Sequence, residues 1–322
     1  MDYLVTVIVP VYKVEEYIER CARALFEQTF RSIEYIFVDD LSPDESMEIV
    51  RRVASWYPAR REAVRCVRHF KNRGVAAARN TGLHEAHGDY IAFCDGDDWM
   101  EPDAIEKMYE AAVRGGADVV WTDFYYTYPN YERVSVQKNK PVGMECIKAL
   151  LCEKMHGGLW NKLVKRDLYE QHDICFLVGL NVWEDLRVCV QLFYYADKVA
   201  YQPGAFYHYV QYNTSSVTSM SLLTGLHDTM GNAKSIIAFL TKKGISKALN
   251  LQVACLKLAA KRNLLVTVNR YAFMRWRLIY PEANSYILSY RALPLRLRLL
   301  GWCTAHGWWP VVNFWIFLKK RL

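Results

Sequence analysis

Short apolar runs alternate with amphipathic stretches through the first half of the chain, and this alternation limits the folds open to it. The apolar runs are rich in β-branched residues, are each long enough for one strand, and lie at 4–9, 33–38, 63–69, 90–94 and 119–124. The stretches between them carry good helix formers and lie at 15–28, 43–57, 75–85 and 102–114. This pattern predicts an α/β fold of the Rossmann-like kind, in which a mostly parallel central sheet is flanked by helices on both faces.

The second half follows a different pattern. Residues 125–141 are polar and aromatic without a clear period, which predicts a long loop or an irregular hairpin. Helices are expected at 144–154 and 183–195, with short strands at 199–202 and 205–209. After Ser221 the pattern predicts helices only, at about 222–243 and 246–268 and in shorter pieces to the end. We therefore expect an α/β domain at 1–220 and an α-helical C-terminal region at 221–322.

Cysteine usage and the start of the chain indicate a cytoplasmic protein. The nine cysteines are scattered and never spaced C-x-x-C, so neither a disulfide framework nor a zinc site is indicated, and a reducing compartment is expected. The apolar segment at 3–10 is too short to span a bilayer and lacks the features of a signal peptide. The chain is therefore expected to begin in the cytosol.

The end of the chain is basic and aromatic. No acidic residue follows Glu282, whereas six Lys and Arg residues do, together with Trp302, Trp308, Trp309, Phe314, Trp315 and Phe317. Such a segment suits the headgroup region of an anionic membrane, so peripheral contact with the inner face of the cell membrane is expected. The alternative is a helix that packs on the core and ends in a solvated basic turn. The apolar run at 308–318 is too short to cross a bilayer.

Carboxylates follow two of the predicted strands at the point where each strand ends. V-D-D closes the second strand at 38–40, and C-D-G-D-D closes the fourth at 94–98. In an open α/β sheet ligands bind outside the carboxyl ends of the strands, so these groups are expected to gather at one edge. Asp95 and Asp97 flank Gly96, which permits a tight turn, and offer the hard oxygen ligands that Mg²⁺ or Mn²⁺ shares with substrate phosphates. The alternative is that these carboxylates only form a turn and cap the next helix.

Five motifs in order resemble those of one enzyme family. They are V-I-V-P-V-Y at 7–12, V-D-D-x-S-x-D at 38–44, N-R-G-V-A-A-A-R-N-x-G at 72–82, G-D-Y-I-A-F-C-D-G-D-D-W at 88–99 and W-E-D at 183–185. Together they are far more specific than any one alone. The chain resembles family 2 glycosyltransferases of the type that builds bacterial surface polysaccharides, which have the GT-A fold. The resemblance covers about the first 220 residues and leaves the helical end uncovered.

The resemblance implies a nucleotide site at the first two strand ends. The backbone of Pro10, Val11 and Tyr12 would hold the base, for which uracil is the family preference. The Asp40 carboxylate would accept a hydrogen bond from an N–H of the base. Asp39 is the alternative for this contact, or it acts as a structural cap.

The resemblance also implies a metal site beside the nucleotide. Arg79 would lie near the nucleotide and the carboxylates, although a surface ion pair is its alternative role. Asp95, with Gly96 beside it, would reach the ribose or a water on the metal, and Asp97 would bind Mn²⁺ or Mg²⁺ directly. The ion would then neutralise the charge that grows on the departing diphosphate.

Transfer of a sugar also needs a base. A sugar hydroxyl is a poor nucleophile until a carboxylate takes its proton, and one such group opposite the leaving phosphate gives a single displacement with inversion. Asp185 matches the base position of the family, and its neighbour Glu184 could exchange roles with it. Adjacent helical residues point about 100° apart, so one of the two is expected to face the sugar. Alternatively, both only stabilise a helix N-terminus.

Three further residues are candidates with ordinary alternatives. Trp160 and Lys162, in W-N-K, resemble a segment on the acceptor side of bacterial members, where Lys162 would meet a phosphate; a buried Trp beside a surface Lys is the alternative. His208, in F-Y-H-Y, would touch the diphosphate or the metal, or else is a hydrogen-bonded strand histidine. The polar run at 213–218 is expected to form a flexible lid.

The expected activity is an inverting transfer of single sugars. Lys13 stands where Asn is common and Leu41 replaces the usual Gly, so the turn after the second strand is expected to differ from the family. The Q-x-x-R-W signature of processive synthases is absent. The expected partners are a nucleotide-sugar donor, for which the family resemblance favours a UDP-sugar, and a glycan or lipid-linked acceptor. No nucleic acid is expected, and the oligomeric state is not predicted.

Two alternative functions differ from this one in the residues that they require. A sugar-phosphate nucleotidyltransferase is also α/β and metal-dependent, but it would have a glycine-rich phosphate-binding stretch after the first strand. Residues 11–16 contain no glycine. The second alternative is a non-catalytic protein that binds nucleotide sugars, and the joint presence of Asp95, Asp97 and Asp185 argues against it.

Overall fold

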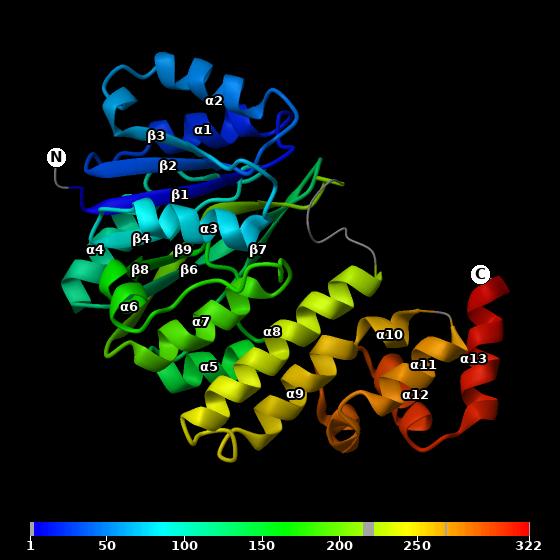
Figure 1. Ribbon diagram of the computed structural model, residues 1–322. Helices are drawn as coiled ribbons and strands as arrows, with labels where there is room; N and C mark the ends of the chain where they lie inside the picture. The colour runs from blue at the N-terminus through cyan, green and yellow to red at the C-terminus, as the bar shows by residue number, and fades with distance from the viewer. Residues whose placement is uncertain (1–2, 215–221, 268, 322) are drawn as a thin grey trace. The chain divides into compact units, whose positions relative to one another are not determined.

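A nine-stranded sheet forms the centre of the first part of the chain. The computed structural model describes residues 3–214, 222–267 and 269–321. Within them the strand order is β3-β2-β1-β4-β8-β6-β9-β5, and β7 pairs with β6 at the side (Figure 1). The predicted α/β class is confirmed, and the sheet is mixed, with parallel and antiparallel pairs.

The parallel half of the sheet follows the predicted strands closely. It comprises β1 (Val5–Val11), β2 (Ile33–Asp39), β3 (Val64–Arg68) and β4 (Tyr90–Phe93). β2 and β4 flank β1 in parallel, and β3 runs parallel to β2. β1, β2 and β4 are almost wholly buried because helices cover both faces, which explains their near-continuous apolar runs, whereas the edge strand β3 is only partly buried. Their carboxyl ends therefore deliver residues 10–12, 39–40 and 94–98 to one edge.

Three helices connect these strands and cover opposite faces. They are α1 (Ile18–Phe26), α2 (Ser46–Ser55) and α3 (Val75–Glu85), the last with the predicted bounds. Val5, Val7 and Val9 belong to the core that holds α1 and α2. Ile8 points to the other face, where a Cβ at Gly82 of α3 would lie 2.2 Å from its Cγ2. Alternation along β1 thus divides its side chains between the two helical layers.

The other half of the sheet contains a strand that the pattern did not predict. β8 (Lys162–Lys165) lies antiparallel between β4 and β6 (Val119–Thr127), and a short helix α6 (Arg166–Gln171) follows it. β9 (Val199–Val210) runs parallel to β6 and antiparallel to the short β5 (Trp99–Met100). The two strands predicted at 199–202 and 205–209 are therefore one strand, whose pairing register shifts opposite Thr122 and Asp123. The predicted irregular hairpin is β6 with β7 (Glu132–Ser135).

Three more helices and one 3₁₀ turn complete the elements described up to residue 214. They are α4 (Ala104–Gly115), α5 (Gly143–Leu151), α7 (Glu184–Tyr195) and η1 (Arg61–Ala63). α4 and α7 begin within two residues of the predicted positions. All nine cysteines, each within the described residues, are free thiols.

The chain divides into two compact units. The first comprises residues 1–147 and 156–219, and the second residues 148–155 and 220–322. Glu153 shows why the short segment belongs to the second unit, since its carboxylate pairs with Arg262 and with the hydroxyl of Tyr290. The division of the chain into a transferase domain at 1–220 and a separate helical region at 221–322 remains a prediction about function.

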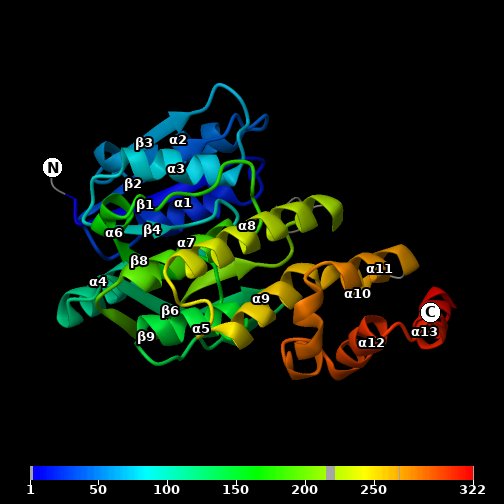
Figure 2. The same cartoon turned by 60° about the horizontal axis from the view of Figure 1, so that its bottom comes forward.

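The described part of the second unit is helical. Its elements are α8 (Leu222–Lys242), α9 (Asn250–Lys261), α10 (Asn263–Val266), α11 (Arg270–Leu278), η3 (Pro281–Ser289), α12 (Leu295–Ala305) and α13 (Trp309–Arg321). α8 and α9 lie side by side (Figure 2). The helix predicted at 246–268 is split into α9 and α10, and Val268 lies outside the described residues.

A buried lysine ties α9 to the segment that follows α11. Lys261 is fully buried, and its Nζ donates to the carbonyl of Trp276 (3.1 Å) and to Oδ1 of Asn284 (2.5 Å). The same ammonium lies 4.3 Å from the centroid of the Trp276 ring. A buried cation must be hydrogen-bonded to be tolerated, and here oxygen acceptors meet that need. None of the helices in the described part of the chain combines the length and the apolar character that crossing a bilayer requires.

Candidate active site

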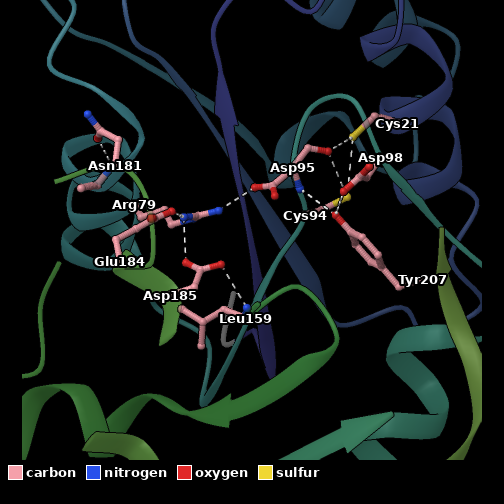
Figure 3. Close-up of polar contacts among 11 residues, drawn as sticks. Cys21, Arg79, Cys94, Asp95, Asp98, Leu159, Asn181, Glu184, Asp185 and Tyr207 are labelled. Carbon is pink, nitrogen blue, oxygen red and sulfur yellow. Dashed lines mark hydrogen bonds and ion pairs between the residues drawn. The ribbon is translucent and has the colours of Figure 1, made fainter. Parts of the chain in front are cut away.

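One buried arginine joins carboxylates from two distant parts of the chain. Arg79 of α3 is 3% exposed, and its NH2 lies 2.8 Å from Oδ1 of Asp95, just after β4. Its NH1 lies 2.5 Å from Oε1 of Glu184 and 2.8 Å from Oδ1 of Asp185, at the start of α7. Figure 3 shows the guanidinium between these groups. The predicted site residues Arg79, Asp95, Glu184 and Asp185 are therefore in direct contact.

Burial and charge compete at this arginine and its partners. Burial alone would lower the pKa of Arg79, but Asp185, Asp95 and Glu184 outweigh it and hold the pKa above its ordinary value. Burial, and then the neighbouring Asp185, raises the pKa of Glu184 to about 8. Burial also raises the pKa of Asp185, which Arg79 partly opposes. Because one arginine contacts three carboxyl groups, their negative charges are only partly balanced, and this arrangement favours a protonated Glu184 near neutral pH.

The backbone before the two acidic residues of α7 is strained. Trp183, the residue before Glu184, has φ +70°, a left-handed conformation that is uncommon for a bulky side chain. A second contact fixes Asp185, whose Oδ2 accepts from the backbone N–H of Leu159 at 3.2 Å. Strain of this kind persists where the surroundings over-determine the backbone, and it clusters at functional sites.

The turn at Asp95–Asp98 is held by the end of β9. The hydroxyl of Tyr207 accepts from the backbone N–H of Asp95 (3.0 Å) and donates to Oδ2 of Asp98 (2.7 Å). The other oxygen of Asp98 accepts from the backbone N–H of Val210 (2.8 Å). A side chain at Gly96 would be crowded, because a Cβ there would lie 3.2 Å from the carbonyl oxygen of Pro10. Asp98 is therefore a structural anchor, and it fixes how the turn presents Asp95 and Asp97.

Asp97 occupies a position that favours a cation. Burial, and then the charge of Asp95, raises the pKa of Asp97 to about 6. Its Oδ2 accepts from the side-chain amide of Asn213 at 2.7 Å. Asn213 begins the lid predicted at 213–218, of which residues 215–218 lie outside the described residues.

The two carboxylates of the turn fit a divalent metal ion only with help from a substrate. Within the described residues no group of three His, Cys, Asp or Glu side chains is arranged to hold a metal ion. The chemistry of Asp95 and Asp97, two neighbouring hard oxygen donors whose mutual repulsion a cation would relieve, suits Mn²⁺ or Mg²⁺ with further ligands from phosphates and water. The residues present therefore fit the implied metal.

The two aspartates after β2 have different surroundings, which reverses our preference for the base contact. Both oxygens of Asp40 are occupied: Oδ1 contacts Nδ1 of His69 (2.6 Å) and accepts from the Arg73 N–H (2.8 Å), and Oδ2 accepts from the Gly74 N–H (2.7 Å). Asp40 thus organises the turn that begins α3. Asp39 accepts from the Ser42 N–H (2.7 Å) and pairs with the exposed Arg68 (3.3 Å). Both side chains are buried, but Asp39 has fewer protein partners than Asp40, and one of them is an exposed arginine, so we prefer Asp39 for the base contact.

The backbone of residues 10–12 lies at the sheet edge beside these aspartates. Pro10 and Val11 end β1, and the carbonyl of Val11 accepts from the Asp40 N–H at 3.0 Å. Tyr12 follows and is exposed. The two departures from the family pattern lie here in left-handed backbone, Lys13 with φ +54° and Leu41 with φ +56°. Leu41 therefore keeps the conformation for which glycine is the usual residue, at a cost in backbone strain.

The structure gives three predicted ligand-binding side chains other partners. Lys162 is buried and its Nζ donates to the carbonyls of His156 (3.1 Å) and Gly158 (2.5 Å) and to Oδ1 of Asn161 (2.9 Å). This accounts for all the protons of an ammonium, so the prediction that Lys162 meets a phosphate is not supported. Trp160 is buried and stacks on Tyr207, with ring centroids 4.5 Å apart, so it indirectly supports the turn at Asp95–Asp98, the candidate metal turn.

His208 lies on β9 with both ring nitrogens engaged. Nδ1 contacts Glu132 at 2.8 Å and Nε2 contacts Glu101 at 2.9 Å. The ring is also stacked against Trp99 and Tyr125, at centroid distances of 4.6 Å each. The predicted contact with a metal or diphosphate is therefore not supported, and the strand-histidine alternative describes the geometry.

Sequence reasoning missed several residues that hold the site. Tyr207, Asn213, His69 and Asn181 each bind a site residue or the start of α3; the side chain of Asn181 accepts from the Ala76 N–H at 3.3 Å. At Gly74 the backbone has φ +84° and a Cβ would lie 2.4 Å from Asn181, which explains the glycine of the N-R-G motif. The signal for Tyr207 was available, since a strand that ends beside the metal turn presents alternate residues to it.

Comparison with known proteins identifies the family. Glycosyl transferase family 2 matches residues 6–173, more than half of the chain. The chain belongs to this family. A relative in Bacillus subtilis, the uncharacterized glycosyltransferase EpsJ, is 32% identical over 254 residues, which cover 76% of this chain and 72% of EpsJ. Glycosyltransferase GlyA of Streptococcus pneumoniae is 31% identical over 228 residues, and the match spans 65% of this chain but only 31% of GlyA.

Solved structures share the fold. S. aureus TarS 1-349 in complex with UDP-GlcNAc superposes with a TM-score of 0.72 at 17% identity, over 93% of this chain and 86% of TarS 1-349. A mannosyltransferase, PcManGT from Pyrobaculum calidifontis, solved in complex with GDP-Man and Mn²⁺, gives a TM-score of 0.56 at 18% identity, over 99% and 85% of the two chains. The predicted GT-A fold of a family 2 glycosyltransferase is confirmed.

Proposed function

We propose that this glycosyltransferase moves a single sugar from a UDP-sugar to a hydroxyl of a glycan acceptor, with inversion at the anomeric carbon. The observation that carries the proposal is the contact of Arg79 with Asp95, Glu184 and Asp185, which joins the metal turn to the candidate base. The choice of UDP is supported by the UDP-GlcNAc complex of the similarly folded TarS. The nucleotidyltransferase alternative has no support from the family.

The donor would lie across the edge formed by β1, β2 and β4. Asp39 accepts an N–H of the base, the backbone at residues 10–12 borders the base, and Asp95 reaches the ribose or a water beside the diphosphate. Asp97, with Asp95, would hold Mn²⁺ or Mg²⁺, a choice supported by the Mn²⁺ complex of the similarly folded mannosyltransferase. When bound, such an ion neutralises charge on the departing diphosphate.

Asp185 would act as the base. The acceptor hydroxyl attacks the anomeric carbon of the donor sugar, its proton passes to Asp185, and the bond from that carbon to the diphosphate oxygen breaks. Glu184 is the less suitable base because its raised pKa favours the protonated form near neutral pH. Arg79 and the Leu159 N–H hold the Asp185 carboxylate in place, so that little reorganisation is needed when the proton moves.

The acceptor is proposed to be lipid-linked, with the enzyme at the cytoplasmic face of a membrane. The support is the basic and aromatic end of the chain, where Trp308, Val311 and Phe314 are exposed on or beside α13. Aromatic and basic side chains together favour the interface of an anionic membrane.

Thermal unfolding with a panel of nucleotide sugars tests the proposal. A ligand present at 100 times its dissociation constant stabilises the folded state by about 2.7 kcal/mol. We expect UDP-sugars to raise the melting temperature more in Mn²⁺ than in EDTA, and Asp97→Asn to abolish the difference. Asp197→Asn, at an exposed carboxylate, is the matched control and should behave as wild type. Indifference to every nucleotide sugar, with and without metal, would overturn the proposed function.

A further inference from the structure

The second unit contains a cavity that the proposed transfer does not use. It lies between α8 and the segment at α11, has a volume of about 340 Å³, and is open to one side. Its lining includes three apolar residues, Leu226, Met230 and Ile279, and three basic residues, His227, Lys234 and Arg275. A cavity lined by apolar and basic residues fits an anion that carries a hydrocarbon part.

In the described part of the chain, one of the three basic lining residues pairs with a carboxylate. Asp228 pairs with Nδ1 of His227 at 3.1 Å, and its side chain is buried. Lys234 is exposed and Arg275 is half-buried, and both line the cavity. A guanidinium and an ammonium that line one cavity suit a phosphate, which Arg can bind through two parallel hydrogen bonds.

α11 carries an exposed apolar stripe beside this cavity. Tyr271, Met274 and Leu278 are 66%, 46% and 74% exposed and follow one another at spacings of three and four, so they share one face of the helix. The opposite face is buried through Phe273 and Trp276. Arginines at 270, 275 and 277 flank the stripe. An apolar helix face bordered by arginines is the pattern of a helix that lies in a membrane interface.

The composition of this part of the chain indicates the sign of the charge on its partner. Residues 220–322 contain sixteen Lys and Arg against two acidic residues, Asp228 and Glu282. Each basic residue near an anionic membrane surface contributes about 1 kcal/mol of binding free energy, whereas a neutral surface offers no such gain. An apolar stripe beside an excess of positive charge therefore complements a surface that is both anionic and hydrocarbon-rich, which is an anionic lipid bilayer.

We propose that α11 lies in the surface of an anionic membrane and that the adjoining cavity takes the phosphate headgroup of a phospholipid. Lys234 and Arg275 hold the phosphate, Leu226, Met230 and Ile279 contact the first carbons of the lipid, and the stripe on α11 inserts between neighbouring lipids. The inference rests on the proposed function for the membrane location, and it assigns the attachment to α8 and α11, in addition to the basic end of the chain.

Vesicle sedimentation of the full-length protein tests the inference. Wild type is mixed with vesicles of phosphatidylcholine alone or with added phosphatidylglycerol. We expect binding to the anionic vesicles and little to the neutral ones. Lys234→Gln with Arg275→Gln should weaken that binding about 30-fold, since each basic residue accounts for about fivefold. Leu278→Asp should weaken it by a similar factor through the stripe.

The controls separate this attachment from other causes. Arg114→Gln with Lys198→Gln removes the same charge from exposed positions of the first unit and should leave binding within about twofold. Binding of the cavity variant equal to that of this control would overturn the inference, as would failure of wild type to bind anionic vesicles. A loss confined to Trp308→Ser with Phe314→Ser, at the end of the chain, would overturn it too.

Two further measurements distinguish a lipid phosphate from a free phosphate, and the membrane inference from the proposed function. If inorganic phosphate raises the melting temperature of wild type but not of the cavity variant, and no vesicle binding is seen, the cavity is a site for free anions and the membrane inference is wrong. Stabilisation by UDP should be unchanged in the cavity variant, because its residues lie outside the carboxylate site. Loss of UDP stabilisation in wild type itself would count against the proposed function and leave the vesicle result standing.

Discussion

Removal of Arg79 should destabilise the first unit strongly. The guanidinium is 3% exposed and lies within 2.5 to 2.8 Å of three carboxylates. Arg79→Ala leaves Asp95, Glu184 and Asp185 gathered without their cation. Breaking a buried ion pair by deleting one partner costs about 3–5 kcal/mol, because the remaining charge is buried and uncompensated. We expect a loss in this range, with Arg79→Lys intermediate, since an ammonium keeps the charge but not the planar fork.

Urea unfolding in EDTA, followed by circular dichroism, measures this loss without a contribution from bound metal. Arg114→Ala, an exposed arginine in the last turn of α4, is the matched control and should cost less than about 1 kcal/mol. A loss below about 1 kcal/mol for Arg79→Ala would show that the three carboxylates do not depend on this arginine. The link between the metal turn and the candidate base would then be refuted.

Three more predictions follow from single contacts. Tyr207→Phe removes the hydroxyl that binds both Asp95 and Asp98. It should lower the free energy of unfolding, measured in urea, by about 1–3 kcal/mol and should reduce donor turnover. Unchanged turnover would contradict the role of Tyr207 in positioning the turn. Gly82→Ala should cost about 1–3 kcal/mol by calorimetry, since the added methyl group would lie 2.2 Å from a methyl group of β1, and a neutral effect would show that α3 shifts freely. Burial, and then the charge of Lys162, lowers the pKa of His156 in the folded protein to about 3. Between pH 6.5 and pH 3 the unfolded chain therefore binds one more proton than the folded chain, and the free energy of unfolding should fall by up to about 1.4 kcal/mol for each pH unit of acidification. His156→Asn should flatten this slope, and an unchanged slope would refute the assignment.

Most of the fold was predictable from the alternation of strand and helix patterns in the sequence. α3 has the predicted bounds, and the first four strands begin and end within two residues of prediction, because each lies between clear helix signals. β8 was missed because four residues, K-L-V-K, give no period to read. β9 was predicted as two strands because Pro203 and Gly204 have the pattern of a turn. In the structure these residues lie where the pairing with β6 changes register.

In the candidate site, only the residues at strand ends and in the motifs could be predicted from the sequence. The topology places Asp95 beside the edge, and Arg79, Glu184 and Asp185 meet there as the motif order implied. The hydrogen-bond partners of a side chain depend on tertiary contacts that no local pattern contains. Asp40 is saturated by His69 and the start of α3, and such contacts over 29 residues or more cannot be inferred from one sequence.

Transfer by Asp185→Asn tests the central claim most directly. The amide keeps the shape of the side chain but cannot take a proton from the acceptor hydroxyl. We expect UDP to stabilise the variant as it stabilises wild type, while transfer from the UDP-sugar falls by about 10²–10⁴. Asp197→Asn should retain both properties. Transfer at the wild-type rate by Asp185→Asn would contradict the assignment of this carboxylate as the base, and with it the account of how the carboxylates at this edge of the sheet act together.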